Sequence, residues 1–273
     1  MKVAVVPYDP HWAEAYIWET DFALLRQRGY DPEATQHAPL RDEYMGALKN
    51  GEFDHIGPLI DPRKASLDVG ANRGQFTLKL AAASSRVVVI EPLRQCAFLG
   101  DILPTNCRFC NCAVGEADGE LELKTPLVDG SPVEGCSTFC DLAQIGYGDH
   151  VSQRTRVERI DAIVERELRD EPVGFIKMDV EGWEDQALRG TENTIKRHRP
   201  NLLVELWPTQ MPDAARRIEG LGYRGFFYFD HRLHSLTAFR HSIHTAPEND
   251  YNPRNWAAFR PELHVNNFYF VPV

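Results

Sequence analysis

Short apolar runs alternate with segments of helical periodicity through the middle of the chain. Four runs have the near-continuous hydrophobicity of buried parallel strands, namely Ser66–Val69, Val87–Ile90, Phe175–Val180 and Leu202–Leu206. The segment Trp183–His198, between the last two runs, is predicted to be a helix that Pro200 ends. This alternation predicts an α/β fold with a mostly parallel sheet and helical crossovers.

Two further features complete the expected sheet. Arg108–Val114 is an apolar-leaning run that predicts a third strand in chain order, and Leu121–Lys124 is expected to return as a hairpin at the sheet edge. Tyr223–Phe229 and Phe268–Val271 are aromatic-rich runs that predict two closing strands. Residues 61–273 are therefore expected to form the main domain.

Residues 1–60 are predicted to be a helical extension of that domain. Helical patterns cover Trp12–Gln27, which Gly29 stops, and Leu40–Lys49. The extension is expected to pack on the core. In the alternative interpretation, one of its aromatic side chains forms a wall of the acceptor pocket, the candidates being Tyr8, Trp12 and Trp18.

A polar, proline-containing segment lies between the two closing strands, at about residues 231–264. Its composition is typical of a long loop, and long loops often act as lids or binding loops. His241 and His244 are spaced to share one helical turn within it. The segment's histidines are candidates for contact with a substrate, with solvated loop side chains as the alternative.

The stretch Ala65–Leu80 (ASLDVGANRGQFTLKL) predicts a strand, a glycine-containing turn and the start of a helix. Gly70 and Gly74 permit backbone angles that other residues avoid, and a ligand can approach closely where no Cβ intrudes. The turn is expected to present free backbone N–H groups to a carboxylate or phosphate. Asp68, at the end of the strand, is placed to meet a cation. Since an amino acid carries both charges, the stretch favours S-adenosylmethionine over a dinucleotide.

The next predicted strand ends in Glu91–Pro92. A carboxylate at this place can accept hydrogen bonds from both ribose hydroxyls of an adenosine group. The G-x-G-x-x-G fingerprint of dinucleotide sites is missing, because three residues separate Gly70 from Gly74. The two strand ends together indicate a nucleoside-containing cofactor, and a nicotinamide-dependent oxidoreductase is the less favoured alternative.

Acidic residues also follow the later strands: Asp179 and Glu181 end one of them, and Glu205 ends the next. Ligands of open parallel sheets bind outside the carboxyl ends of the strands. Four acids are therefore expected on one rim: Asp68, Glu91, Asp179 and Glu205. A sulfonium cofactor or a divalent metal would balance their charge. The structural alternatives are that Glu181 caps its own helix and that Glu205 pairs with a nearby Arg or Lys.

The composition of the chain limits the classes of partner that it is expected to bind. The net charge of −10 argues against nucleic acid or an anionic membrane, although Arg154, Arg156 and Arg159 form a local basic cluster. No apolar run approaches the roughly 18 residues of a membrane span, and the start of the sequence does not have the pattern of a signal peptide. A cytoplasmic protein with reduced thiols is expected.

The cysteines are either buried thiols or ligands of a zinc site. Cys107, Cys110 and Cys112 lie close together, with Cys136 and Cys140 further along the chain. A zinc site usually pairs two C-x-x-C-like knuckles, which this spacing lacks. On a strand, two of the first three cysteines would point to the same face as small apolar residues. Buried thiols are therefore favoured.

A set of motifs in fixed order covers Ala65–Pro208. They are LDVGANRGQFTLKLA, VVVIEP, NCAVGEADGELEL, GCSTF, RVERIDAIV, FIKMDVEGWEDQALRG and LLVELWP, with a weaker match in GYRGFFYF and NNFYFVP. This set resembles the FkbM family of S-adenosylmethionine-dependent methyltransferases. The resemblance implies a class I (Rossmann-like) fold with a seven-stranded, mostly parallel sheet flanked by helices. It also implies O-methyl transfer, often to sugar hydroxyls of glycans, glycolipids or natural products.

The resemblance implies roles for individual residues. The methionine part of the cofactor would be held by Asp68, Gly70, Asn72 and Gly74, and the same site includes Ala71, Phe76 and Asp179. Glu91 and the adjoining Pro92 would hold the ribose. Asn111 and Ala113 would border the adenine. Ser137 and Thr138 fall in a Ser/Thr-containing loop of the family that would complete the site.

The candidate catalytic residues are Asp179, Glu181 and Glu205. A sugar hydroxyl is a poor nucleophile, so a general base is expected, with Asp179 or Glu181 favoured over a histidine of the tail. Asp179 and Glu205 fall where cation-dependent O-methyltransferases keep metal-binding carboxylates. Leu206 and Trp207 replace the Asp-Asn pair of those enzymes, so no metal ligand is assigned and a divalent cation stays the less favoured cofactor. The expected partner is a small-molecule or glycan acceptor, and the alternatives are a nitrogen acceptor or a non-catalytic protein that binds the cofactor.

Overall fold

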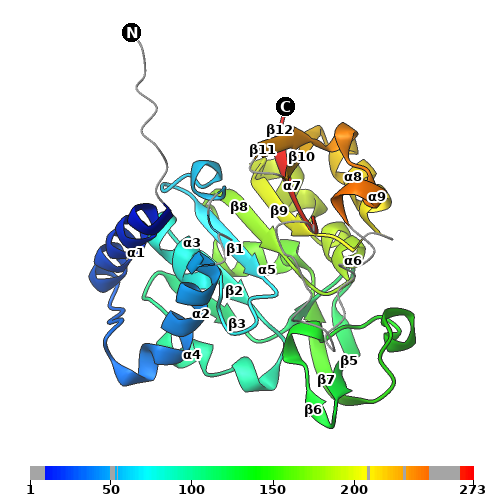
Figure 1. The fold of residues 1–273 in the computed structure, drawn as a ribbon, viewed down its shortest axis with the longest axis horizontal. Coiled ribbons are helices and arrows are strands. Elements are labelled where there is room, and N and C mark those ends of the chain that lie inside the picture. The colour runs from blue at the N-terminus through cyan, green and yellow to red at the C-terminus, as the bar shows by residue number, and fades with distance from the viewer. Residues whose placement is uncertain (1–9, 50–52, 54, 208–209, 230–231, 246–264) are drawn as a thin grey trace.

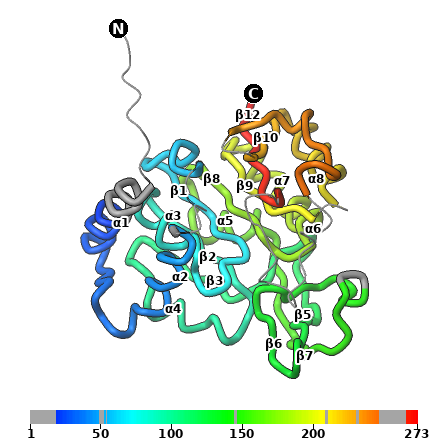
Figure 2. The backbone as a smooth tube through the Cα atoms, viewed as in Figure 1, coloured from blue at the N-terminus to red at the C-terminus, as the bar shows by residue number. Residues whose placement is uncertain are grey.

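The computed structural model describes residues 10–49, 53, 55–207, 210–229, 232–245 and 265–273. In this part of the chain, helices flank an eight-stranded sheet, and a smaller four-stranded sheet extends away from it at the lower right of the view (Figure 1, Figure 2). The expected architecture, a mostly parallel sheet flanked by helices with further helices at the N-terminus, is confirmed.

The large sheet has the strand order β11-β10-β12-β9-β8-β1-β2-β3. Its parallel strands are β1 (Ala65–Val69), β2 (Val87–Ile90), β3 (Cys107–Cys110), β8 (Val173–Met178) and β9 (Asn201–Glu205). β12 (Asn267–Pro272) runs antiparallel between β9 and β10 (Tyr223–Phe229). The strand order reverses between β1 and β8, and a ligand crevice forms outside the carboxyl ends of strands at such a point.

Helices cover both faces of the large sheet. One face carries α1 (Pro10–Gln27), α2 (Ala38–Lys49), α3 (Thr77–Ala83) and α4 (Leu99–Ile102). The other carries α5 (Ile160–Glu167), α6 (Glu184–Arg189), α7 (Glu192–His198) and α8 (Met211–Gly220). Because successive strand residues point to opposite faces, Val89 packs in the first layer and Ile90 in the second.

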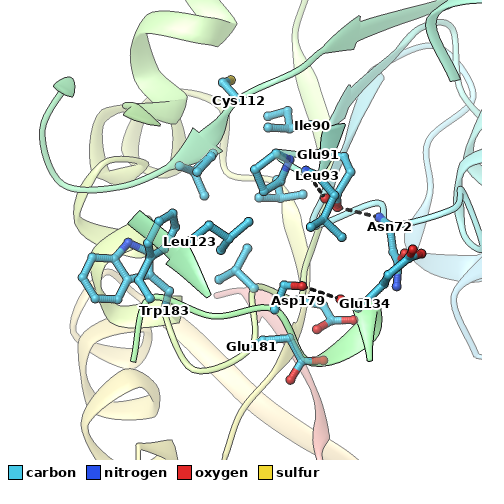
Figure 3. Close-up of a pocket in the computed structure, with 18 of the residues that line it drawn as sticks. Asn72, Ile90, Glu91, Leu93, Cys112, Leu123, Glu134, Asp179, Glu181 and Trp183 are labelled. Atoms are coloured by element: carbon cyan, nitrogen blue, oxygen red, sulfur yellow. Dashed lines mark hydrogen bonds between the residues drawn. The ribbon is translucent and has the colours of Figure 1, made fainter. Parts of the chain in front are cut away.

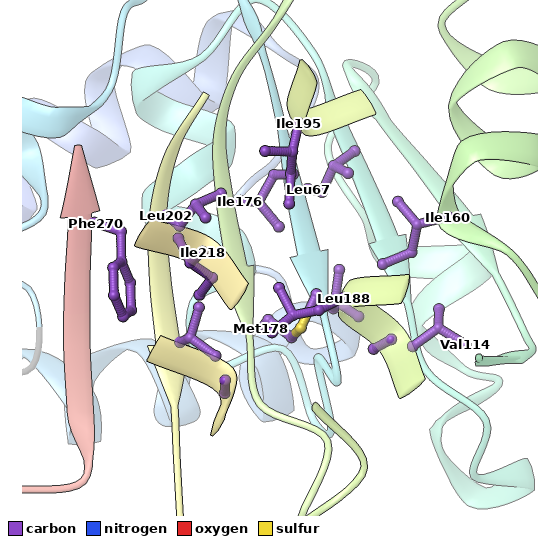
Figure 4. Packing of buried hydrophobic residues seen from close by; sticks show 14 of the residues in the cluster. Leu67, Val114, Ile160, Ile176, Met178, Leu188, Ile195, Leu202, Ile218 and Phe270 are labelled. Carbon is purple, nitrogen blue, oxygen red and sulfur yellow. The ribbon is translucent and has the colours of Figure 1, made fainter. Parts of the chain in front are cut away.

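The second layer is the core shown in Figure 4. Leu67, Ile176 and Met178 from the strands pack with Leu188 and Ile195 from the helices. All five side chains are at most 1% exposed. Burying a side chain of this size contributes about 1.5–3 kcal/mol, so this layer holds the parallel strands, and therefore their carboxyl ends, in fixed register.

The predicted helix Trp183–His198 is two helices, α6 and α7. The chain breaks at Gly190, where an added Cβ would lie 2.0 Å from the backbone oxygen of Gly115. Thr191 follows and donates its hydroxyl to the Ala187 carbonyl. The close approach of two backbone segments interrupts the helix, and local periodicity carries no sign of it.

The predicted third strand also divides. β3 ends at Cys110, and the chain then enters the small sheet through β4 (Ala113–Val114). The hairpin expected at the sheet edge belongs to this second sheet, whose order is β4-β7-β5-β6. Its other strands are β5 (Gly119–Val128), β6 (Ser131–Pro132) and β7 (His150–Glu158).

The basic cluster expected near β7 is neutralised by acids. The ion pairs are Arg154 with Glu120, Arg156 with Glu158, and Arg159 with Asp118. Their charges are therefore matched locally, and the cluster is not a basic patch of the kind a phosphate backbone needs.

Part of the expected loop at 231–264 is ordered structure, and the rest lies outside the described residues. β11 (Arg232–Ser235) pairs antiparallel with β10 and adds an eighth strand to the expected seven. α9 (His241–His244) follows, and His244 packs among Phe227 and Phe239 with 8% of its surface exposed. The loop prediction was wrong here because aromatic side chains from β10 provide a surface for this segment to bury.

The N-terminal helices pack against α3. Leu25 on α1 and Tyr44 on α2 belong to the same buried cluster as Leu78 and Leu80 on α3. Between these helices, the Asp21 carboxylate accepts hydrogen bonds from the Tyr44 hydroxyl (2.7 Å) and the Lys79 ammonium (2.8 Å). The aromatic side chains of Tyr8, Trp12 and Trp18, predicted as an alternative pocket wall, lie outside the described side chains.

The cysteines are free thiols, and Cys110 and Cys112 are buried. Burial raises the pKa of Cys112 to about 12, so it stays a thiol at neutral pH. Among the described residues, no group of three or more His, Cys, Asp or Glu side chains is arranged to hold a metal ion. In the same part of the chain, no helix is both long enough and apolar enough to cross a bilayer.

Replacing Lys79 with Met is expected to lower the free energy of unfolding by about 3 kcal/mol, because it leaves the Asp21 carboxylate buried without its cation. Urea denaturation measures the change. Lys196→Met is the matched control, since Lys196 pairs with Glu192 on the exposed face of α7 and exposed ion pairs contribute little. Equal losses in the two variants would show that Asp21 and Lys79 do not hold the N-terminal helices on α3.

Candidate functional site

A cleft lies between the carboxyl ends of β1, β2 and β8 and the small sheet (Figure 3). Its empty space, open mouth included, is about 580 Å³, a size typical of small-molecule sites. The residues predicted for the site that line it are Gly70, Asn72, Glu91, Pro92, Ala113, Ser137, Asp179 and Glu181. Those predicted for the site that do not line it are Asp68, Ala71, Gly74, Phe76, Asn111, Thr138 and Glu205.

One end of the cleft is an apolar slot. Leu123 from β5 and Trp183, just before α6, lie on this side in Figure 3. Phe139 completes it, with its ring 5.3 Å from the Trp183 ring. The two rings are in contact with each other and form one aromatic wall, on which a flat heterocycle can stack. None of these three residues was predicted for the site, although all three lie inside the family motifs.

Glu91 also lines the cleft, at the end of β2. It is 4% exposed, and its two carboxylate oxygens accept the backbone N–H groups of Asn72 (2.7 Å) and Leu93 (2.8 Å). Burial raises the pKa of Glu91 to about 7, against the opposing effect of the two N–H donors. Each oxygen keeps a lone pair, so the carboxylate can still accept two hydroxyl groups.

Asn111 supports Glu91 from behind the cleft. Its side-chain amide donates to the backbone carbonyl of Glu91 (2.7 Å) and, more weakly, to that of Leu93 (3.4 Å). The residue follows the end of β3, where the chain leaves the large sheet. Its position therefore fixes the loop that carries Glu91, and its side chain does not line the cleft.

The turn after β1 differs from the expected one. Four of its N–H groups are used within the protein: those of Gly70 and Ala71 donate to the Ile90 carbonyl, and that of Gly74 donates to the Ala71 carbonyl. The Asn72 N–H is bound to Glu91. The prediction that these groups are free for a ligand was wrong, because the turn folds back onto the end of β2.

Two glycines of this turn are required by close packing. Gly70 has φ +75°, and a Cβ on it would lie 1.7 Å from the Asp179 backbone oxygen. Gly74 has φ +91°, and a Cβ there would lie 2.2 Å from Leu40 Cδ1 on α2. Gly70 thus brings the ends of β1 and β8 together, whereas Gly74 makes room for the N-terminal helices.

Asp68 is fully buried beneath the turn. One of its carboxylate oxygens accepts the Thr77 hydroxyl (2.6 Å), and the other has no hydrogen-bond partner among the described residues. Burial raises the pKa of Asp68, while the nearby Lys177 ammonium opposes that rise. Whereas the sequence placed Asp68 against the cofactor, its side chain points toward the start of α3.

Lys177 provides a cation at the acidic end of the cleft. Its ammonium donates to the Gly70 carbonyl (3.0 Å) and to an Asp179 carboxylate oxygen (3.1 Å), and lies 5.2 Å from the centre of the Phe76 ring. Its side chain is 7% exposed. Burial acts to lower the pKa of Lys177, but the carboxylates of Asp179 and Asp68 raise it above its ordinary value. Lys177 was not predicted for the site, although a lysine inside an apolar strand beside acids is a recognisable signal.

Glu181 lines the cleft with backbone φ +52°. Burial and the neighbouring Asp179 and Glu205 carboxylates raise its pKa well above the ordinary value. It does not cap the helix that follows. That helix has no side-chain cap, and the carboxylate of Glu184, its first residue, accepts the N–H groups of Val180 (3.0 Å) and Gly182 (3.3 Å) in the turn before it.

Glu205 ends β9 next to this group. Its carboxylate accepts the Asn266 side-chain amide (2.6 Å), and no Arg or Lys of the described residues forms an ion pair with it. Burial and the charge of Asp179 raise its pKa well above the ordinary value, while Lys177 opposes the rise. The structural alternative, a local ion pair, is therefore wrong for the described residues, and the partner of Glu205 is an amide.

The mouth of the cleft is bridged by an ion pair. Arg73, on the turn after β1, donates to the Glu134 carboxylate at 3.0 Å. Glu134 begins a short 3₁₀ helix, and its backbone carbonyl accepts the Ser137 hydroxyl (2.8 Å). Thr138 lies further in and donates its hydroxyl to the Glu181 carbonyl (2.6 Å). The loop after β6 is thus attached to both sides of the crevice.

Comparison with known proteins gives one family match. The sequence model described as "Methyltransferase FkbM domain" matches residues 68–225, more than half of the chain. This range contains the residues that line the cleft. No curated protein matches the chain.

Several solved structures are similar at low identity. Methyltransferase FkbM from Methylobacillus flagellatus KT is 17% identical with a TM-score of 0.46; the alignment covers 96% of this chain, which spans 61% of that protein's length. An rRNA methylase from Streptococcus thermophilus is 12% identical with a TM-score of 0.44, covering 81% of this chain and 94% of that one. Magnesium protoporphyrin IX methyltransferase from Synechocystis PCC 6803, with bound SAM, is 12% identical with a TM-score of 0.35, covering 99% and 100%.

Replacing Gly70 with Ala is expected to cost on the order of 3 kcal/mol of stability or more, because the new methyl group would overlap the Asp179 carbonyl. Gly130→Ala is a matched control, since Gly130 has nearly the same φ (+76°) with open space around the added atom. The control isolates the backbone strain, about 1 kcal/mol. Thermal unfolding compares the two, and similar losses would mean that β1 and β8 are not in close contact at this point.

Proposed function

Because the chain belongs to the FkbM family of methyltransferases, we propose that it transfers the methyl group of S-adenosylmethionine to a hydroxyl group of a sugar. Its fold is the class I methyltransferase fold that the sequence predicts. The proposed acceptor is a glycan, a glycolipid or a glycosylated natural product. The observation that carries the proposal is that one cleft is lined by an aromatic wall, by Glu91 and by the carboxylates of Asp179 and Glu181.

The residues of the cleft fit the proposed cofactor part by part. The wall that Phe139 and Trp183 form offers an apolar surface on which an adenine ring can stack, and Glu91 keeps lone pairs for two ribose hydroxyls. Asp179 and Glu181 supply negative charge for an ammonium and a sulfonium. When bound, S-adenosylmethionine supplies a methyl group already activated on a positively charged sulfur.

The chain's contribution is then to position the acceptor and to take up its proton. A sugar hydroxyl reacts poorly until a base removes its proton, and the candidate bases that line the cleft are the carboxylates of Asp179 and Glu181, with Glu205 next to them. A carboxylate serves as a base near neutral pH when its pKa is raised. Burial has this effect on Glu181 and Glu205.

Replacing Glu91 with Gln is expected to weaken S-adenosylmethionine binding by about 10- to 100-fold, because an amide replaces one of the two charged acceptors for the ribose. Isothermal titration calorimetry measures the affinity. Glu122→Gln, on the exposed surface of β5, is the control and should bind like the wild type. Binding of a nicotinamide dinucleotide in place of S-adenosylmethionine would overturn the cofactor proposal.

The wild-type protein is expected to convert S-adenosylmethionine to S-adenosylhomocysteine only when a suitable sugar is present. A panel of glycans and glycosides with radiolabelled cofactor detects the transfer, and mass spectrometry locates the new methyl group. Transfer to nitrogen acceptors alone would contradict the proposed acceptor class. Tight cofactor binding without transfer to any member of either class would favour a non-catalytic binding protein.

A further inference from the structure

The acids at the end of the cleft differ in their counter-charges. Asp179 contacts the Lys177 ammonium directly, and the same ammonium is bound to the Gly70 carbonyl. Glu181 and Glu205 form no ion pair with any described residue. One cation is therefore shared unequally: it neutralises Asp179 and leaves the carboxyl group of Glu181 facing the cleft without a partner charge.

Lys177 also fixes where Asp179 can be. The Asp179 N–H donates to the Val69 carbonyl (3.0 Å), and its own carbonyl lies against Gly70. Backbone and side chain of Asp179 are thus both tied to the turn after β1. Glu181 is two residues further on, where the strand has ended and the carboxyl group has no such attachment.

We propose that Lys177 is a positioning residue that keeps Asp179 as a fixed anion, so that Glu181 is the group that exchanges a proton in the cleft. This inference rests on the proposed function and assigns its general base. Glu181 loses its proton to solvent when a positively charged cofactor enters. Its carboxylate then accepts the proton of the acceptor hydroxyl as the O–CH₃ bond forms, the S–CH₃ bond breaks and the bonding pair stays on sulfur.

This assignment balances charge through one turnover. The free protein carries a neutral Glu181, and the complex with the sulfonium carries an ionised one. After transfer the sulfur is neutral and Glu181 is protonated again. Binding of S-adenosylmethionine therefore ionises Glu181, the base that the reaction needs, whereas binding of S-adenosylhomocysteine does not.

Several other groups face Glu181 and act on its protonation. The charged or titratable ones are Asp179 from the end of β8, Glu205 from β9, Glu184 from α6, Cys136 from the 3₁₀ helix over the cleft, and Tyr147. Glu184 is held by two backbone N–H groups, so its contacts do not change when the cleft fills. Glu91 has a pKa of about 7 and also titrates, but it faces the ribose, which both forms of the cofactor carry.

The test compares S-adenosylmethionine with S-adenosylhomocysteine, which differ in the charge on sulfur. Calorimetric titrations of the full chain in two buffers of different ionisation enthalpy give the protons released on binding. The wild type is expected to release more protons with S-adenosylmethionine, by up to about one proton at the midpoint between the pKa of Glu181 with S-adenosylhomocysteine bound and its lower pKa with S-adenosylmethionine bound. Release from Glu91 cancels in the difference between the two ligands.

The variants assign the proton to a residue. Glu181→Gln is expected to abolish the difference. Asp179→Asn should keep it but move its midpoint down by about one pH unit, since a like charge beside Glu181 is gone. Lys177→Met should move the midpoint up, because Asp179 is left without its cation.

The double variant Lys177→Met, Asp179→Asn removes both buried charges together and keeps the experiment informative if Lys177→Met fails to fold. It should behave like Asp179→Asn. Survival of the difference in Glu181→Gln together with its loss in Asp179→Asn would overturn the inference. Equal proton release with the two ligands in the wild type would overturn it as well, while leaving the proposed function intact. Failure of the wild type to bind either ligand would instead overturn the proposed function.

Discussion

The contact of the Lys177 ammonium with the Gly70 carbonyl and the Asp179 carboxylate is the interaction on which the site depends. It joins the turn after β1 to the end of β8, at the point where the strand order reverses. A buried ammonium is unfavourable unless several acceptors surround it. The carboxylates at this rim satisfy that need, so the acids that concentrate negative charge in the cleft also stabilise the lysine that arranges them.

Much of this site could be predicted because the signals are local. An apolar run that ends in an acid predicted Glu91, and a strand, a glycine turn and a helix predicted the position of Gly70. The orientation of the Asp68 side chain could not be predicted, because it depends on a hydroxyl group of the next helix. Asp68 turns toward Thr77, and whether a strand-end acid faces the cleft or a helix is decided by that hydroxyl.

The apolar slot shows a different limit of prediction. Leu123 and Phe139 come from the small sheet and its loop, whose place over the cleft is set by pairing between β5 and β7. No periodicity within either segment encodes that pairing. The helix break at Gly190 likewise follows from a backbone contact with Gly115. Local patterns therefore gave the fold and the rim, while the walls of the cleft required tertiary contacts.

The fit of Leu40 against Gly74 has a consequence for how the molecule could be shortened. The turn after β1 takes its shape with a leucine from α2 pressed into the space that any larger residue at Gly74 would fill. Leu78 and Leu80 on α3 are hidden by the same layer. A truncated protein that begins at residue 61 would expose this apolar face to water and aggregate. The N-terminal helices are therefore a structural part of the molecule and cannot be removed from it.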